Sequence, residues 1–162
     1  SSCDILSELT KFDLPYETSV SVPLIVASDS TLSIETPSIN TGISAAMDKY
    51  NTGLDMIDEI TLTSMTLTLT EPVDGDFGFL KSIAVFISAT GQEEIQLAFD
   101  TAVTPDAGAV LELETSDADL QNYIKMDDFK MRFSIGTDET VLTRQEITMN
   151  MLIHVDAKVL GL

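Results

Sequence analysis

The sequence predicts an all-β fold, a two-layer antiparallel β-sandwich of about eight strands, Ig-like or jelly-roll-like, with two short helices. Three observations predict it. Apolar residues recur at every second position over most of the chain, and Thr and other β-branched residues are frequent. No segment repeats at a fixed period, which argues against a solenoid or a propeller. Two sheets that face each other would bury the alternate apolar residues.

The chain has 162 residues, of which 44% are hydrophobic. A chain of this length can bury a real core without disulfides or metals. No composition shift or low-complexity linker divides the sequence. We expect residues 1–15 to form an N-terminal tail and residues 16–162 to form one domain.

Period-two patterns mark the individual strands. They predict strands over residues 16–26, 31–36, 59–70, 81–89, 94–100, 108–114, 128–135 and 145–159. Thr90 to Glu93 would form the turn of a hairpin between the fourth and fifth strands.

Two strands carry local signals. Pro23 lacks an N–H group, which restricts the first strand to a sheet edge. In the third strand the apolar phase slips by one residue around Ser64, which predicts a β-bulge there because a bulge restores the same inward face.

The closing strand is unusually long. Its alternation runs from Ile147 to Val159, a span of about 43 Å at roughly 3.3 Å per residue. Most strands are shorter. We expect this strand either to bend across both sheets or to reach beyond its own domain.

Helical spacing occurs twice. Ile43, Met47 and Tyr50 share one helical face, and Asn51 and Gly53 offer a stop. A second helix would begin with a capping box formed by Ser116 and Asp119. Its buried face would consist of Leu120, Tyr123 and Ile124.

The charge balance excludes two function classes. The chain has 27 Asp and Glu against 8 Lys and Arg, a net charge of −19. So acidic a surface repels phosphate backbones and anionic lipid headgroups, so we expect no nucleic-acid partner and no polybasic membrane contact. One Cys and one His can form neither an internal disulfide nor a His/Cys zinc site.

His154 is the sole histidine, so a Ser/His/Asp triad would have to use it as the general base. No G-x-S-x-G motif presents a serine to it. We therefore interpret it as a partly exposed strand histidine and do not expect an enzyme.

Acidic residues gather at the turns. Asp74 and Asp76, on either side of Gly75, are the best candidate for a calcium site, since hard cations prefer carboxylate oxygens. The alternative is that they are solvated turn residues that keep the protein soluble. No other cofactor is expected.

Cys3 suggests export. The run Ser1-Ser2-Cys3 is similar to the end of a bacterial lipoprotein signal, in which the cysteine becomes acylated. We expect an extracellular, cell-surface or periplasmic protein that contacts the membrane only through a lipid anchor at Cys3. The alternatives are an incidental thiol and an intermolecular disulfide.

The texture and order of the strands also carry a family resemblance. The stretch from Ser1 to Val26, the segments EITLTSMTLTLTEP and FGFLKSIAVFISATGQEEIQLA, and the closing strand resemble small exported lipoprotein-like β-sandwich proteins of Bacteroidetes-type bacteria. The resemblance implies export and a non-catalytic role. It brings no functional residues with it.

These observations favour a non-catalytic structural or assembly protein of the bacterial cell exterior that associates with copies of itself or with other envelope proteins. Terminal or edge strands would make the contact. The residues expected to carry it are those of the first strand, Tyr16, Val20, Val22, Leu24 and Val26.

The alternative is a monomeric envelope lipoprotein module that binds a hydrophobic ligand or a protein partner. Methionines would line its adaptable pocket. They are Met47, Met56, Met65, Met126, Met131, Met149 and Met151.

Overall fold

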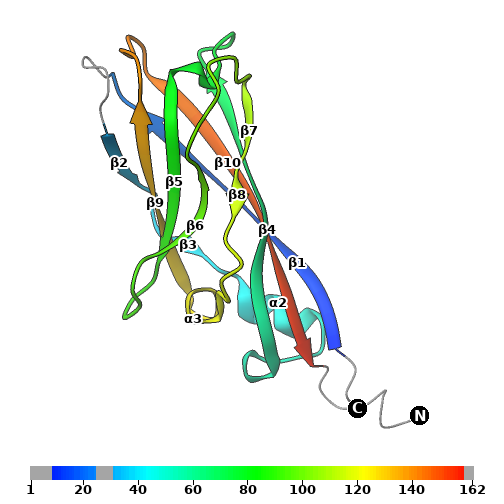
Figure 1. Ribbon diagram of the computed structural model, residues 1–162. Coiled ribbons are helices and arrows are strands. Elements are labelled where there is room, and N and C mark those ends of the chain that lie inside the picture. The colour runs from blue at the N-terminus through cyan, green and yellow to red at the C-terminus, as the bar shows by residue number, and fades with distance from the viewer. Residues whose placement is uncertain (1–8, 25–30, 159–162) are drawn as a thin grey trace.

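Two antiparallel sheets face each other in the computed structural model, which describes residues 9–24 and 31–158 (Figure 1). The first, here called the β1 sheet, has the order β1-β10-β4-β7. Its strands are β1 (Leu9–Val22), β10 (Gln145–Lys158), β4 (Ile57–Glu71) and β7 (Val110–Glu112).

The second sheet, here called the β5 sheet, has the order β2-β9-β5-β6-β8, and a short strand β3 also pairs with β9. Its strands are β2 (Thr31–Glu35), β3 (Ile39–Asn40), β5 (Leu80–Ser88), β6 (Ile95–Asp100), β8 (Glu114–Thr115) and β9 (Asp128–Thr137).

The strand pairs are nested. β1 pairs with β10, β2 with β9, β4 with β7, and β5 with β6, all antiparallel. A long hairpin folded over on itself in this way is a jelly roll. The structure thus confirms the predicted antiparallel β-sandwich and selects the jelly-roll form from the two styles expected.

Seven of the eight predicted strands begin and end within about two residues of the observed ones, counting β7 and β8 together. Both bounds of the first strand were wrong. β1 ends at Val22 and not at residue 26, so Pro23 lies just outside the strand. β1 begins at Leu9, so residues 9–15, expected in the tail, belong to the sheet. Phe12 and Leu14 continue the inward alternation of Tyr16, and Pro15 is tolerated because β1 is an edge strand.

The bulge predicted near Ser64 is confirmed. Leu152 of β10 faces Ser64, whereas the next residue, Ile153, faces Leu62, so Thr63 is the extra residue. Both Thr63 and Ser64 are exposed, and the apolar residues on either side point into the core.

The closing strand neither bends across both sheets nor leaves its domain. β10 stays in the β1 sheet, where β1 and β4, of 14 and 15 residues, accompany it along its length. Near the chain termini these three strands extend past the β5 sheet, and the helix α2 (Ile43–Lys49) lies against them instead (Figure 1).

The first predicted helix is confirmed as α2, with Ile43 and Met47 buried. The helix ends at Lys49 with Tyr50 as its C-cap, and the next residue, Asn51, has a left-handed backbone with φ 54°. A single turn of 3-10 helix, η1 (Leu54–Met56), follows it, and another, η2 (Phe77–Phe79), precedes β5.

The start of the second helix was wrong, although its buried face was right. α3 (Gln121–Ile124) has Leu120 at its N-cap position, and no side chain there accepts a capping hydrogen bond. The Ser116 hydroxyl accepts from the Ala118 N–H instead, and the Asp119 carboxylate accepts from the Gln121 N–H. These local turns compete with the capping box.

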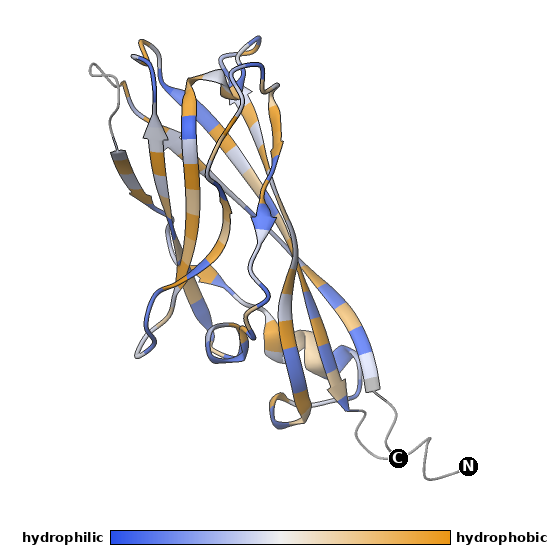
Figure 2. Cartoon of the chain, in the orientation of Figure 1, coloured by the Kyte–Doolittle hydropathy of each residue, from blue (hydrophilic) through white to orange (hydrophobic). Residues whose placement is uncertain are grey.

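Figure 2 shows hydrophobic and hydrophilic residues alternating along the long strands. In β10 every odd-numbered residue from Gln145 to Ala157 is buried. Period two therefore decides which side chains form the core and which face solvent.

Candidate functional site: the open edge of strand β1

Strand β1 forms one edge of its sheet. It pairs with β10 from Leu9, opposite Lys158, to Val22, opposite Gln145, without a shift of register. Within the described part of the chain, no strand pairs with its other side. The edge therefore offers a continuous row of backbone donors and acceptors.

Pro15 identifies the backbone groups that face this edge. A proline inside a strand is tolerated where its missing N–H would point to solvent. Pro15 therefore faces outward, and so do the other odd-numbered residues, because successive residues of a strand direct their backbone groups to opposite sides. Those with described side chains are Lys11, Asp13, Glu17, Ser19 and Ser21.

The hydrogen bonds of the neighbouring strands lead to the same assignment. The Met65 carbonyl accepts a hydrogen bond from the Leu113 N–H, so the backbone groups of Met65 point away from β10. The preceding residue, Ser64, therefore faces β10, where it pairs with Leu152. Leu152 thus bonds toward β4 and not toward Pro15, which lies opposite it on β1.

The inward side chains hold β1 firmly in place. The Phe12 ring stacks on Tyr50 just beyond α2, with 4.3 Å between ring centroids and 8° between planes. The Tyr16 ring meets Phe129 edge-on at 5.4 Å, and its hydroxyl donates to the Thr41 carbonyl. Burial raises the pKa of Tyr16 to about 12. The edge is therefore rigid, and binding would not have to order it.

The predicted assembly residues lie mostly on the wrong face for a side-chain contact. Tyr16, Val20 and Val22 are buried in the core. Leu24 is 59% exposed, and Val26 lies outside the described residues. What β1 offers a partner is its backbone edge and the odd-numbered side chains, which the alternation itself could have identified.

Three polar contacts tie β1 to β10 on the outer face of the sheet. The Ser19 and Thr148 hydroxyls lie 3.2 Å apart. The Ser21 hydroxyl donates to the Glu146 carboxylate at 2.7 Å. The third contact involves Asp13 and His154 (2.8 Å). All three pairs are cross-strand neighbours.

His154 is a partly exposed strand histidine, as expected, with a side chain 33% exposed. Its Nδ1 lies 2.8 Å from Asp13 Oδ1 and its Nε2 lies 3.1 Å from Asp156 Oδ1. The hydrogen bond to Asp13, with the charge of Asp156, raises the pKa of His154 above its usual value. A protonated ring donates to both carboxylates and clamps β1 to β10, which indicates a structural role.

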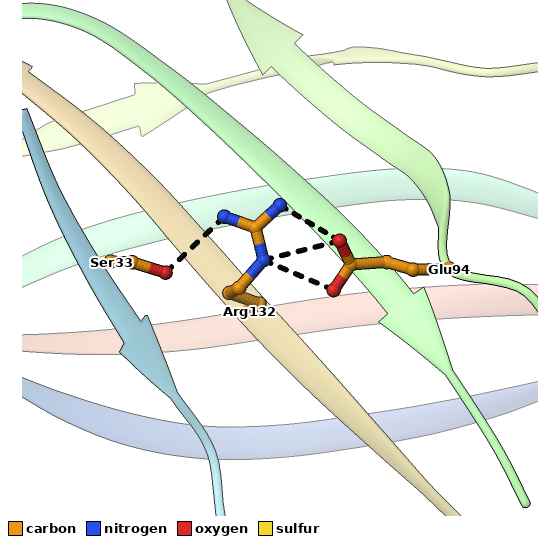
Figure 3. Close-up of polar contacts among 3 residues, drawn as sticks. All are labelled: Ser33, Glu94 and Arg132. Atoms are coloured by element: carbon orange, nitrogen blue, oxygen red, sulfur yellow. Dashed lines mark hydrogen bonds and ion pairs between the residues drawn. The ribbon is translucent and has the colours of Figure 1, made fainter.

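A second polar cluster lies on the outer face of the β5 sheet (Figure 3). Arg132 of β9 donates to both carboxylate oxygens of Glu94 and to the hydroxyl of Ser33, and its guanidinium lies 4.4 Å from the Phe86 ring centroid. The hydrogen bond from Arg132 lowers the pKa of Glu94 and raises that of Arg132. Arg132 is thus engaged in tying strands together.

Asp74 and Asp76 lie in the exposed turn between β4 and η2. Asp76 accepts a hydrogen bond from the Gly78 N–H at 2.9 Å and so caps η2. Across residues 9–24 and 31–158, no three His, Cys, Asp or Glu side chains gather into a group that could hold a metal. Calcium binding at this turn stays a prediction.

Cys3, the predicted lipid anchor, lies outside the described residues. Among the residues that the structure does describe, no helix has the length and apolarity to span a bilayer.

Most methionines fill the core. Met47, Met65, Met131, Met149 and Met151 are each at most 3% exposed. Side chains so deeply buried are packing residues and give no support to the adaptable hydrophobic pocket that the sequence allowed.

No family model matches the chain, and no curated protein matches its sequence. Similar solved structures include two BFDV capsid protein assemblies. The decameric one is 13% identical, covering 93% of this chain and 99% of that one, with a TM-score of 0.48. The 60-mer is 9% identical, covering 97% of each chain, with a TM-score of 0.49.

A carbohydrate-binding module from the β-sandwich superfamily is also similar. It is 12% identical, covering 95% of this chain and 57% of that one, with a TM-score of 0.35. All three TM-scores are below 0.5, so these similarities carry no argument about function. One jelly roll serves many functions, which depend on the site that each protein builds on the fold.

Proposed function

We propose that this chain is a non-catalytic structural protein that associates with copies of itself through the open edge of strand β1. One observation carries the proposal. β1 is a 14-residue edge strand in unbroken register with β10, and its outward backbone groups lack a strand partner among the described residues. Such an edge can take up another strand through main-chain hydrogen bonds.

The rigidity of β1 supports this role. The ring contacts of Phe12 and Tyr16 fix the strand against Tyr50, just after α2, and against Phe129 of β9. A partner strand would therefore add to a preformed template without the entropic cost of ordering it.

The net charge of −19 opposes self-association. At about 0.15 M salt the Debye length is roughly 8 Å, so repulsion between the bodies of two copies is largely screened while contacts at the edge are not. We expect association to strengthen between low and physiological ionic strength.

We also propose that the protein is exported to the cell exterior and acylated at Cys3. This part rests on the sequence Ser1-Ser2-Cys3 alone. Mass spectrometry of material purified from the native source tests it, since acylation adds the mass of the lipid chains to the cysteine.

The test of self-association is sedimentation of the full chain and of the Glu17→Pro variant. Glu17 is exposed and faces the open edge, so proline there removes an outward N–H without breaking the ladder to β10. We expect concentration-dependent association of the wild type and a monomeric variant. The Glu17→Ala control keeps the N–H group and should still associate.

Two results would overturn the proposal. One is a wild type that stays monomeric at about 1 mM, a concentration that reveals association as weak as about 4 kcal/mol. That result would favour the monomeric envelope module. The other is association that Glu17→Pro leaves unchanged. Removal of residues 1–15 would not test the proposal, because residues 9–15 are part of β1.

A further inference from the structure

We infer that two copies pair β1 with β1 in antiparallel fashion, with Lys11 of each copy opposite Glu17 of the other, and that this contact closes a two-fold dimer. The inference rests on the proposed function and specifies its partner, register and stoichiometry.

The parity of β1 limits the possible registers. Only odd-numbered residues direct backbone groups at the open edge, so two β1 strands hydrogen-bond only when odd residues face odd residues. The numbers of two paired residues therefore always add up to an even sum, and this sum changes by two from one possible register to the next. Each is named by the residue at its two-fold axis. Pro15 lacks one donor in every register, so it does not select among them.

Charge selects the register centred on Leu14. There Lys11 lies opposite Glu17 of the second copy, and symmetry repeats the pair. Both side chains are exposed, and neither makes an ion pair with another described residue. Opposite charges directly across an antiparallel pair stabilise it. The overlap runs from Leu9 to Ser19.

The two adjacent registers bring like charges together. Centring on Asp13 places Asp13 opposite itself, and centring on Pro15 places Asp13 opposite Glu17 twice. Like charges directly opposite destabilise a strand pair. One-step slips in either direction are therefore disfavoured.

The registers centred on Phe12 and on Tyr16 are less favourable for other reasons. Centring on Phe12 pairs Lys11 with Asp13, but it shortens the overlap to 9–15, and Asp13 already bonds to His154. Centring on Tyr16 forms no charge pair, because it places Lys11 opposite Ser21 and Asp13 opposite Ser19.

The contact closes on itself. An isologous pair uses the same edge in both copies, so β1 is consumed when the dimer forms. The opposite edge of the sheet is β7, of three residues, after which the chain crosses to the β5 sheet as β8. The β1 sheet thus lacks a second long edge within the described residues, and we expect dimers, not fibres.

Charge exchange tests the register. We would measure the dimer dissociation constant by sedimentation for Lys11→Glu, Glu17→Lys and the double exchange. Each single variant creates two like-charge pairs, so its dissociation constant should rise about tenfold, and the double exchange should return it to within about threefold of wild type. Lys130→Glu changes the net charge equally on an exposed strand residue of the β5 sheet and should change it less than about threefold.

The outcomes separate the two proposals. A dimer that responds to Glu17→Pro but is not rescued by the double exchange overturns the register and leaves self-association through β1 intact. Particles larger than a dimer would contradict the inference that the β1 contact forms a closed two-fold dimer. A chain monomeric at every concentration overturns both. Melting curves of the variants, which change exposed residues only, confirm that each is folded.

Discussion

The two edges of the β1 sheet are built differently. β7 is three residues long, and at Leu113 the chain leaves it to join the other sheet as β8. That crossing ties the two sheets together on this side, because the Leu113 N–H donates to Met65 of β4 while β8 pairs with β6. β1 runs for 14 residues and, among the described residues, pairs with another strand on one side only.

The contrast shows how one jelly roll treats two edges in opposite ways. A strand that changes sheets removes an open edge from its side of the sandwich. On the other side, buried rings and cross-strand contacts hold β1 in place, and its outward backbone groups have no strand partner in the part of the chain that the structure describes. Proteins usually shorten, charge or cover such edges. The open side of β1 carries Lys11, Pro15 and Glu17, but the strand is long, and no described strand covers it.

The largest expected effect comes from proline at adjacent positions of β1. Thr18 is an even-numbered residue, so its backbone N–H points toward β10. Thr18→Pro therefore removes a hydrogen bond between the two strands and should lower the unfolding free energy by about 3 kcal/mol. Glu17→Pro should lower it by less than about 1 kcal/mol, because its N–H faces the edge. Urea denaturation of both variants measures the difference, and equal losses would refute the parity of β1.

The closed edge should respond to packing. Leu113 is 7% exposed at the point where the chain changes sheets. Leu113→Ala should lower the unfolding free energy by about 2–3 kcal/mol through the cavity it leaves. The exposed Leu142 serves as the control, and Leu142→Ala should change stability by less than about 0.5 kcal/mol. A negligible effect at Leu113 would mean that the crossing does not close the sandwich.

The His154 clamp should make the attachment of β1 depend on pH. The pKa of His154 is raised in the folded state, chiefly by its hydrogen bond to Asp13. Its stabilisation is therefore complete below the unfolded pKa of about 6.5 and is lost as pH rises through the folded pKa. Because the pair is partly exposed, we expect less than about 1 kcal/mol.

The measurement is the unfolding free energy of wild type and His154→Gln at pH 5.5 and pH 8.5. The unfolding free energy of the wild type should exceed that of the variant at pH 5.5, and the two values should approach each other at pH 8.5. The variant also corrects for the general effect of acid on so negative a chain. A constant difference at both pH values would contradict the clamp.

The smallest effect is expected at the acidic turn between β4 and η2. Asp74 and Asp76 supply two exposed carboxylates, one already bonded to the Gly78 N–H, whereas calcium takes about six to eight oxygen ligands. Millimolar calcium should therefore raise the melting temperature by less than about 1 °C. A larger rise that Asp76→Asn abolishes would establish the site instead.

The sequence predicted the strands well because period two follows directly from side-chain geometry. It even located the bulge at Ser64, since the bulge changes the phase of the pattern. It misplaced the start of β1, because Pro15 interrupts the stretch where Phe12 and Leu14 continue the alternation.

The site could not be predicted from the sequence in the same way. Which strand lies at an edge depends on the strand order, and the order depends on pairings between distant segments. Asp13 meets His154 only because β1 and β10, the first and last described strands, are neighbours. Local patterns contain no trace of that contact.

Hydrogen exchange along β1, followed as a function of protein concentration, tests the open edge most directly. The amides of Tyr16, Thr18 and Val20 bond to β10 and should be protected at every concentration. Those of Glu17 and Ser19 should exchange rapidly in dilute protein and become protected as copies associate. If Glu17 and Ser19 stay unprotected while the protein sediments as a dimer, the copies meet elsewhere and β1 is not the interface.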